Sequence, residues 1–371
     1  MNKRLRKLAI AILAAFLLIT YARPAQSQIS SYMPEESAPH EGTWLQWPHH
    51  YTYGVRFRNE VESSWIEMTR VLVQSENVHI IAYNRSERRR IRNVLRRAGV
   101  PLARVDFLIR PTDDFWVRDN GPIFVRDLTH GDIVVADWGF NGWGLDAPYM
   151  KDNTVPVGVA NQRDFPRMNL NDLIIEGGAI EVDGNGVLMA TRSSILEPDR
   201  NPGWTQNDVE EYLTGILGVT KFVWLDGRDG GTEDITDTHI DGFARFGRPD
   251  TIVTMNRRDL RYWGLSNRDI NRLYSTRDVS GKRYRRVHLP LTRNNVRTTY
   301  GYNTGFKGSY VNFYVSNGHV LMPTYGDPND AVAKQILQTA FPDRTVVGID
   351  FRNAYLYGGM IHCVTQQQPV E

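Results

Sequence analysis

Hydrophobic residues recur with the period of an α-helix in four stretches of the chain. In each stretch, apolar positions return at intervals of three and four residues, which places them on one face of a helix. We therefore expect helices at residues 58–74, 87–98, 206–217 and 330–340.

Short runs rich in β-branched and aromatic residues lie between these helices and predict strands. They are found at residues 78–83, 105–109, 133–136, 173–182, 187–191, 221–225, 239–246, 251–255, 284–289, 310–315, 320–323, 345–349 and 360–364. The segments Asp183-Gly184-Asn185-Gly186 and Ser316-Asn317-Gly318 are typical of hairpin turns between two such strands.

The order of these elements predicts a mixed α/β protein with short strands in groups and a helix after some groups. A glycine-rich dinucleotide loop that opens a helix is missing, so the pattern does not favour a doubly wound sheet. It fits repeated small sheets, each backed by helix, in a radial arrangement within one domain. Residues 257–297, dense in Arg and Asn, look like an irregular excursion or lid.

The first 27 residues form a separate segment. Basic residues between positions 3 and 7 precede an apolar run at 8–22, and Ala25 and Ser27 place small side chains before a cleavage site. This order predicts a signal peptide over residues 1–27, with residues 28–371 as the folded domain of a secreted or periplasmic protein. The alternative is an uncleaved anchor, although the run is short for a bilayer span. No later segment reaches that length, so we expect no stable membrane insertion after cleavage.

Charge and cysteine content narrow the function. The 371 residues carry 44 basic and 42 acidic side chains, a net charge of +2, which gives no reason to expect a nucleic-acid partner. The chain has a single cysteine, Cys363, so no internal disulfide can form. A lone thiol in an exported protein is open to oxidation, and it is therefore either a small buried residue or a reactive one.

His239 and Asp241 are the first candidates for chemistry. If residues 239–246 form a strand, these two side chains project from the same face, where a histidine beside a carboxylate can serve as an acid–base group. A metal-dependent hydrolase built on Glu233, Asp237, His239 and Asp241 is the alternative. Because no second histidine stands at a ligand spacing, we expect no metal.

Cys363 follows the pair Gly358-Gly359, and glycines let a backbone approach a ligand closely. A nucleophilic thiolate needs such an open approach and a nearby positive charge, which His239 or a bound substrate can supply. In a strand, His362 points to the opposite face from Cys363. We therefore expect His362 to be a packed or surface imidazole.

Asp119 and Asp241 suit one class of substrate. A guanidinium is planar and offers five N–H donors, which carboxylates accept in paired geometry. Each aspartate alone is an ordinary turn or salt-bridge residue. The functional interpretation is favoured because the chain also offers a candidate thiol, Cys363, and a candidate acid–base group, His239.

Several blocks resemble the agmatine deiminases and the bacterial-type peptidylarginine deiminases grouped with them. The resemblance runs from about Met33 to the C-terminus, and its motifs appear in the same order over most of the chain. They are Trp116-Val117-Arg118-Asp119-Asn120-Gly121-Pro122, His239-Ile240-Asp241, Trp138-Gly139-Phe140-Asn141-Gly142-Trp143-Gly144 and Ile361-His362-Cys363-Val364-Thr365-Gln366-Gln367-Gln368-Pro369.

The resemblance implies a five-bladed α/β propeller, the pentein fold, with a cofactor-free site at its centre. It implies that Cys363 is the nucleophile, that His239 is the acid–base group, and that Asp119 and Asp241 hold the guanidinium. Glu176 matches a glutamate that supports the site, and Asn312 a polar position near the substrate. The matching blocks also place Trp116, Gly358 and Gly359 at the substrate.

The resemblance also implies the reaction: a guanidinium loses ammonia and becomes a urea. Agmatine is the expected substrate, and an arginine-containing peptide is the alternative; a propeller that only binds ligands is the alternative of another class. Two departures bear on this choice. Tyr357 and Met360 replace a glycine and an asparagine of the family pattern, and residues 49–54 do not follow the acidic and aromatic pattern usual in agmatine deiminases. An oligomer is compatible with the sequence.

Overall fold

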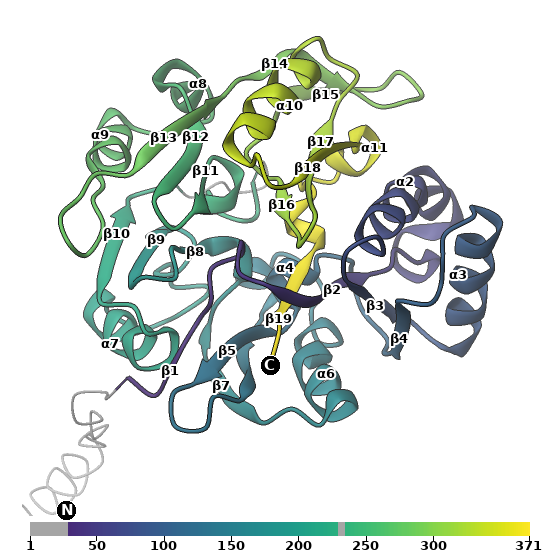
Figure 1. Ribbon diagram of the computed structural model, residues 1–371, viewed down its shortest axis with the longest axis horizontal. Helices are drawn as coiled ribbons and strands as arrows, with labels where there is room; N and C mark the ends of the chain where they lie inside the picture. Colours follow the sequence, from purple (N-terminus) through teal and green to yellow (C-terminus); the bar gives the residue numbers. More distant parts are fainter. Residues whose placement is uncertain (1–28, 229–233) are drawn as a thin grey trace, which may run out of the picture.

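The computed structural model describes residues 29–228 and 234–371. The signal peptide predicted for residues 1–27 lies outside this part of the chain. Within it, no helix is both long and apolar enough to cross a membrane. The small sheets are arranged around the middle of the molecule (Figure 1), as the grouping of predicted strands indicated.

Five sheets share one pattern: an inner strand pairs antiparallel with a second strand, and a third strand pairs parallel with the second. The inner strands face the middle of the molecule (Figure 1). These trios are β5 (Ile123–Asp127), β6 (Ile133–Gly139) and β7 (Arg167–Ile174); β8 (Ile180–Val182), β9 (Val187–Thr191) and β10 (Lys221–Leu225); β11 (Ala244–Arg248), β12 (Thr251–Met255) and β13 (Arg285–Leu289); β16 (Tyr314–Val315), β17 (His319–Thr324) and β18 (Thr345–Asp350); and β19 (Gln366–Pro369), β2 (His40–Gln46) and β3 (Asn77–Ala82).

Two further strands extend these sheets at an edge. They are β1 (Ser31–Tyr32), which pairs with β5, and β4 (Val105–Ile109), which pairs with β3. Because β19 pairs with β2, the C-terminal part of the chain closes the sheet begun by the N-terminal part, with Gln366 opposite Trp44.

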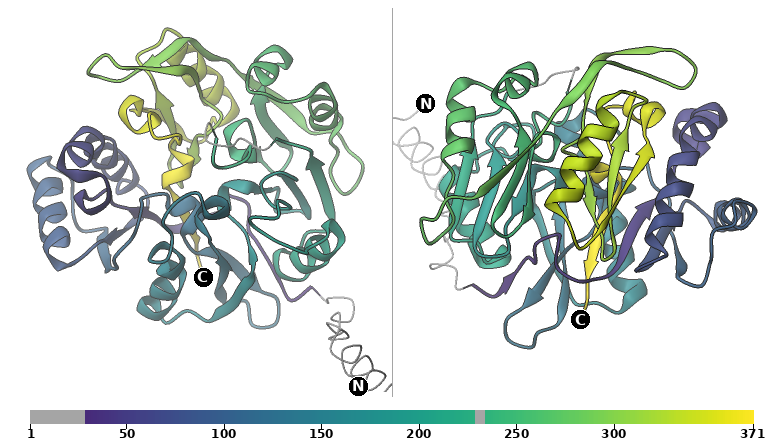
Figure 2. Two further views of the ribbon diagram at one scale, coloured as in Figure 1. Left: turned by 180° about the vertical axis from the view of Figure 1, so that it is seen from behind. Right: turned by 45° about the horizontal axis from the view of Figure 1, so that its top comes forward.

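Helices lie on the outside of the sheets, with apolar faces turned inward (Figures 1 and 2). The longer ones are α2 (His50–Leu72), α3 (Arg85–Arg97), α6 (Val155–Arg163), α7 (Gln206–Leu217) and α10 (Asn329–Ala340). Local chemistry fixes the ends of α7, because Thr205 and Asp208 form a capping box and Gly218 ends the helix in the left-handed conformation. The four predicted helices are confirmed, within a few residues except at the N-terminus of α2.

The predicted excursion at residues 257–297 is wrong, because this segment is mostly regular. It contains the helices α8 (Arg257–Tyr262) and α9 (Asn267–Ser275), strand β13, and strand β14 (Leu291–Arg297), which pairs with β15 (Asn303–Ser309). The β14–β15 hairpin extends from one edge of the molecule (Figure 2). Helix α9 buries only Asp269, Ile270 and Leu273, and so sparse an apolar face gives little periodicity to read.

Four predicted strands are interrupted or shortened near the middle of the molecule. Strand 173–182 breaks at a 3₁₀ turn, η2 (Gly177–Ala179), and strand 239–246 starts with another, η4 (Ile240–Gly242). Strand 360–364 is replaced by η5 (His362–Val364), and strand 310–315 is reduced to β16. These segments are buried, so their apolar content resembles that of a central strand, which the pattern alone cannot distinguish from a buried turn.

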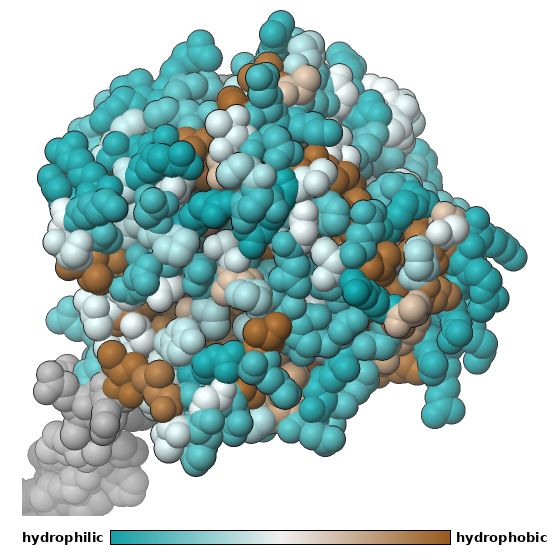
Figure 3. All heavy atoms as spheres, viewed as in Figure 1, coloured by the Kyte–Doolittle hydropathy of each residue, from teal (hydrophilic) through white to brown (hydrophobic). Residues whose placement is uncertain are grey.

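The face of the molecule shown in Figure 3 is largely hydrophilic, with hydrophobic residues in small separate groups. Tryptophans and aromatic rings fill the interior, among them Trp44, Trp47 and Trp65, which are fully buried. Such packing holds the short turns at the centre in fixed positions.

Candidate active site

Four short helical turns meet at the centre of the molecule, and each stands directly before the inner strand of its sheet. Helix α4 (Val117–Asn120) precedes β5, η2 precedes β8, η4 precedes β11 and η5 precedes β19. The turns contact one another, α4 with η2 and η5, and η2 with η4. This convergence brings together Asp119, Glu176, His239, Asp241 and Cys363; Asn312, just before β16, joins them from the fifth sheet.

The Cys363 sulfur faces polar groups. Its Sγ lies 3.4 Å from Nδ2 of Asn312 and 3.8 Å from Oδ2 of Asp241. Burial, together with the charges of Asp241 and Asp119, raises the pKa of the thiol well above its ordinary value. In the ligand-free protein the sulfur is therefore a neutral thiol.

Both ring nitrogens of His239 face carboxylates. Nε2 lies 2.6 Å from Oε2 of Glu176, and Nδ1 lies 3.7 Å from Oδ1 of Asp119. Burial acts to lower the pKa of His239, but Asp119 and Glu176 raise it to about 9. His239 is thus an imidazolium at neutral pH, with a proton available to donate.

Glu176 has a second partner that keeps it charged. Arg200 donates from Nε to Oε1 of Glu176 at 2.8 Å, and its Nη1 donates to Asp237. Burial acts to raise the pKa of Glu176, but Arg200 and His239 hold it below its ordinary value. A buried guanidinium therefore anchors the glutamate that orients His239.

Asp119 is held by two neutral donors. The backbone N–H of Gly178 donates to Oδ1 and the indole N–H of Trp143 donates to Oδ2, both at 3.0 Å. Burial raises the pKa of Asp119 to about 6, which Glu176 and Asp241 reinforce and His239 opposes. The carboxylate is ionised at neutral pH, with capacity for further donors.

Asp241 is held by His362, and the orientation predicted for His362 is wrong. Its Oδ2 lies 2.7 Å from Nδ1 of His362, so His362 points toward the site rather than away from it. The expectation assumed a strand, in which neighbouring side chains alternate. Residues 362–364 form a 3₁₀ turn instead, with three residues per turn, so adjacent side chains do not point in opposite directions.

Four more residues were expected at the substrate: Asn312, Trp116, Gly358 and Gly359. Asn312 lies in the cluster, where its Oδ1 accepts from the backbone N–H of His362 at 2.9 Å and its Nδ2 donates to the carbonyl of Asp241 at 3.3 Å. Trp116 packs over Gly359, where a Cβ would lie 2.1 Å from the indole ring. Gly358 has a φ of 97°, a conformation that favours glycine.

Comparison with known proteins identifies the family of this chain. Residues 32–369 match the family model described as Porphyromonas-type peptidyl-arginine deiminase. The chain is 35% identical to a putative agmatine deiminase of Streptomyces coelicolor, over 91% of this chain and 98% of that protein. It is 32% identical to an agmatine deiminase of Pseudomonas aeruginosa, over 91% and 95%.

This chain belongs to the Porphyromonas-type peptidyl-arginine deiminase family.

Solved structures place the deiminase in the pentein α/β fold. An agmatine deiminase of Enterococcus faecalis superposes with a TM-score of 0.79 at 27% identity, covering 92% of this chain and 96% of that one. A putative arginine deiminase from Porphyromonas gingivalis superposes with a TM-score of 0.77 at 32% identity, covering 91% and 98%. The family and the pentein fold inferred from the sequence motifs are both confirmed.

The metal-site alternative has little support in the described part of the deiminase. Among residues 29–228 and 234–371, no three histidine, cysteine, aspartate or glutamate side chains are arranged to hold a metal ion. Glu233 lies outside these residues, and Asp237 is bound by Arg200.

Several residues of the deiminase site escaped the sequence reasoning. They support the site from behind or from one side: Glu36, Trp143, Gly178, Arg200 and Arg245. Trp143 lies inside a quoted motif and Gly178 stands two positions after Glu176, so both were visible without a role. Glu36 and Arg245 lie outside the quoted motifs, and only folding brings these two residues together.

The segment at residues 49–54, which departs from the family pattern, forms an aromatic rim together with Tyr357. Tyr53 is 44% exposed, and its ring centre lies 5.9 Å from that of Tyr357, the residue before Gly358. The Tyr53 hydroxyl donates to Oδ2 of Asp114 at 2.6 Å, two residues before Trp116. Both departures from the family pattern therefore meet on the side of the site that Trp116 covers.

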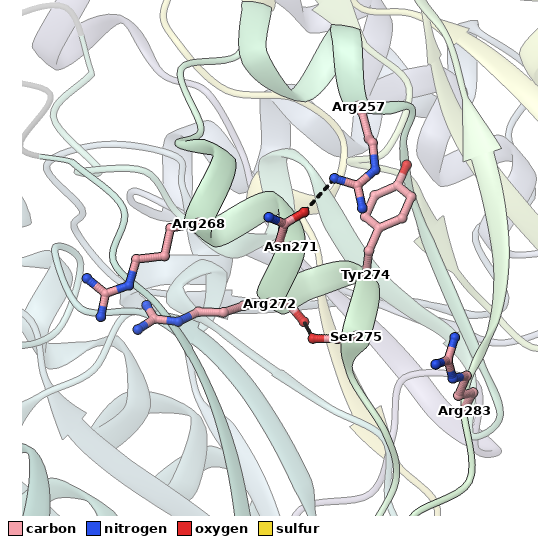
Figure 4. Close-up of a pocket in the computed structure, with 7 residues that line it drawn as sticks. All are labelled: Arg257, Arg268, Asn271, Arg272, Tyr274, Ser275 and Arg283. Atoms are coloured by element: carbon pink, nitrogen blue, oxygen red, sulfur yellow. Dashed lines mark hydrogen bonds between the residues drawn. The ribbon is translucent and has the colours of Figure 1, made fainter.

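Several arginines of residues 257–297 line a surface pocket apart from Cys363. A shallow surface pocket of about 670 Å³ is lined by Arg257, Arg268, Asn271, Arg272, Tyr274, Ser275 and Arg283 (Figure 4). Arg268 and Arg272 pair with Asp226, and Arg257 lies over the ring of Tyr274 while donating to Asn271. None of the residues around Cys363 lines this pocket.

Proposed function

We propose that this deiminase hydrolyses the guanidinium group of agmatine, releasing ammonia and leaving N-carbamoylputrescine. The observation that carries the proposal is the arrangement around Cys363: two aspartates and a protonated histidine converge on one thiol. Relatives with identities above 30% over most of their length, named agmatine deiminases, support agmatine as the substrate.

Binding begins with charge. Asp119 and Asp241 accept N–H groups of the planar guanidinium, which brings its central carbon to the Cys363 sulfur. The same two carboxylates are what oppose ionisation of the thiol. A bound cation compensates their charge, so the thiolate forms when the substrate arrives.

The thiolate then attacks the guanidinium carbon and forms a C–S bond. His239 donates its proton to one nitrogen of the tetrahedral adduct, and that nitrogen leaves as ammonia when its C–N bond breaks. The neutral His239 next takes a proton from water, whose oxygen attacks the same carbon. The C–S bond breaks, the hydroxyl proton of the adduct passes to the departing sulfur, and the ureido product leaves; this proton replaces the one that the thiol released to solvent when the thiolate formed.

The other expected residues support these steps. Glu176 keeps His239 charged and oriented, and Asn312 holds the sulfur and the backbone of η5 in place. Trp116, Gly358 and Gly359 form the wall over the substrate, where the absence of a Cβ at Gly359 lets the indole lie against the backbone.

The five sheets act as the blades of a propeller in this proposal. Their shared strand pattern supports it, since each inner strand is followed by an antiparallel and then a parallel partner. Each blade supplies a site residue from the segment just before its inner strand.

The experiment is ureido-product formation by residues 28–371, with agmatine, free arginine and an arginine-containing peptide offered side by side. We expect turnover of agmatine that survives a chelator and falls roughly 10⁴-fold or more in Cys363→Ala. Turnover of the peptide instead of agmatine reassigns the substrate. If Cys363→Ala is as active as the parent protein, Cys363 is not the nucleophile.

A further inference from the structure

His362 lies between two buried carboxylates. Its Nδ1 is 2.7 Å from Oδ2 of Asp241, and its Nε2 is 2.8 Å from Oε2 of Glu36. The imidazole side chain is 2% exposed, so water does not replace either partner. The proposed catalytic steps make no use of this histidine.

Both nitrogens of this ring need a proton. A neutral imidazole carries one N–H and one lone pair, and a lone pair facing a carboxylate oxygen is repulsive. With an oxygen within 2.8 Å of each nitrogen, the arrangement is satisfied when both nitrogens donate. The geometry therefore indicates an imidazolium at position 362.

The charges behind the ring support the same state. Glu36 also accepts from Arg118 at 3.2 Å and from Arg245 at 2.8 Å, and Arg245 pairs with Glu181. These groups comprise two arginines and, with Asp241, three carboxylates. A positively charged His362 brings the buried cluster to three cations and three anions, which avoids an uncompensated buried charge.

The cluster reaches the thiol through a single oxygen. Oδ2 of Asp241 accepts from His362 and lies 3.8 Å from the Cys363 sulfur. The backbone of His362 is fixed independently, since its N–H donates to Asn312, which also contacts the sulfur. On the opposite side, the charged groups facing Asp241 and the thiol are His239 and Asp119.

We propose that His362 is a positioning residue: a buried cation, set by Glu36, that aligns Asp241 and keeps it ionised for guanidinium binding. It touches neither the substrate nor the reacting atoms. It acts through Asp241, and it couples the pentein core around Glu36 to the reactive centre. This role rests on the proposed deiminase function.

Loss of the cation has a defined effect on Asp241. Burial acts to raise the pKa of Asp241, but the contact with His362, helped by His239 and Arg245, holds it below its ordinary value. Without His362 the effect of burial is less opposed, so the pKa of Asp241 rises and the carboxyl takes up a proton more readily. Raising the pH removes that proton and restores the guanidinium site.

The test compares His362→Gln and His362→Asn in the full chain. The Gln variant removes the donor to Asp241, and we expect its KM for agmatine at pH 7 to rise roughly 30-fold or more, with a much smaller change in kcat. Between pH 6 and 8.5 this KM should fall as pH rises, while that of the parent stays nearly constant. The Asn variant keeps a neutral donor in place of Nδ1, so its KM should rise less.

His319→Gln is the matched control, because His319 lies half-buried in β17 with Ser75 as its partner, away from the site. If KM in His362→Gln does not depend on pH, or if kcat alone falls, the positioning role is wrong.

A measurement on the unaltered protein covers the case in which the variants do not fold. Nitrogen NMR of histidine-labelled protein should show the ring of His362 protonated on both nitrogens at pH 7; a neutral ring there overturns the proposal. This readout does not need turnover. An inactive protein with a doubly protonated His362 therefore counts against the deiminase function and not against the buried cation.

Discussion

Gly178 is the residue around which the charged groups of the site are packed most closely. A Cβ at this position would lie 2.6 Å from Nδ1 of His239, 2.8 Å from Oδ1 of Asp119 and 3.1 Å from Oδ2 of Asp241. The side chains of His239, Asp119 and Asp241 therefore meet at a point that only a glycine leaves free, and the N–H of Gly178 also binds Asp119.

Gly178→Ala should abolish most activity while the protein still folds. The added methyl group displaces the groups that bind the guanidinium and donate the proton, so we expect kcat/KM to fall at least about 100-fold. The cost in the free energy of unfolding should be about 1–3 kcal/mol. Gly131→Ala is the control for activity: its φ of 82° means that alanine strains the backbone there as well, but in an exposed turn where a Cβ meets nothing within 4 Å. Normal activity in Gly178→Ala would show that these contacts are not needed.

A plot of kcat/KM against pH should fall on both the acidic and the alkaline side. Below about pH 6 Asp119 takes up a proton and loses the charge that binds the guanidinium, so kcat/KM should fall as pH falls. Above about pH 9 His239 loses the proton it must donate, so kcat/KM should fall as pH rises. The measurement is kcat/KM for agmatine from pH 4.5 to 10.5.

Glu176→Gln provides the check on this assignment. It removes a carboxylate that raises the pKa of His239, so the alkaline limb should move to lower pH while the acidic limb persists. An alkaline limb that does not move means that His239 is not the group titrating there.

At the scale of single residues, the site was predicted from functional groups that occur together in a few short motifs. Cys363, His239, Asp119, Asp241 and Glu176 were selected from motifs, and the structure brings all five together. The orientation of His362 was missed because a strand was assumed where the backbone makes a 3₁₀ turn. An error in the predicted secondary structure leaves the choice of site residues unchanged, but it makes the predicted directions of their side chains wrong.

At the scale of elements, prediction succeeded where helical periodicity is regular and where a short run of apolar and β-branched residues is not interrupted by glycine or charged residues. Residues 206–217 were predicted as the helix that α7 forms, and 187–191, 221–225 and 251–255 match β9, β10 and β12. It failed in segments buried on all sides, such as 239–246, where periodicity carries no information about local turns.

Strand β19 is the element with the largest predicted effect on stability. It pairs with β2, Gln368 accepts from the indole of Trp44 at 2.9 Å, and Gln367 accepts from buried Arg118 at 2.8 Å. Ending the chain after Thr365 keeps Cys363 but removes these bonds. We expect the free energy of unfolding to drop by more than about 4 kcal/mol, at about 1 kcal/mol for each lost hydrogen bond, and activity to disappear.

Ending the chain after Pro369 is the matched comparison, because it removes only two exposed residues. It should cost no more than about 2 kcal/mol, since it loses only the bond from the N–H of Val370 to Pro39 and the bond from Arg126 to the carbonyl of Val370. Chemical denaturation followed by circular dichroism measures both. Equal stability of the two shortened proteins would mean that β19 does not hold the fold.

At the scale of the whole molecule, the structure shows a repeated strand pattern that the sequence does not reveal. The five sheets share their strand pattern, yet the residues contributed from the same place in each are chemically unlike, for instance Asp119, Asn312 and Cys363. What the units share is topology and the position of a polar group, and neither leaves a repeated set of residues. Self-similarity in sequence is therefore too weak to reveal the repeat.

The pairing of β19 with β2 also bears on how the molecule comes to exist. It joins residues more than 300 positions apart, as the bond between Trp44 and Gln368 illustrates, and such distant contacts are slow to form because a long loop must first close. Cys363 stands immediately before that last-closing strand. During refolding, helices and local sheets therefore assemble ahead of the reactive centre. A half-folded molecule then has the Cys363 thiol without the groups that surround it, and we expect catalytic competence to be the final property to emerge.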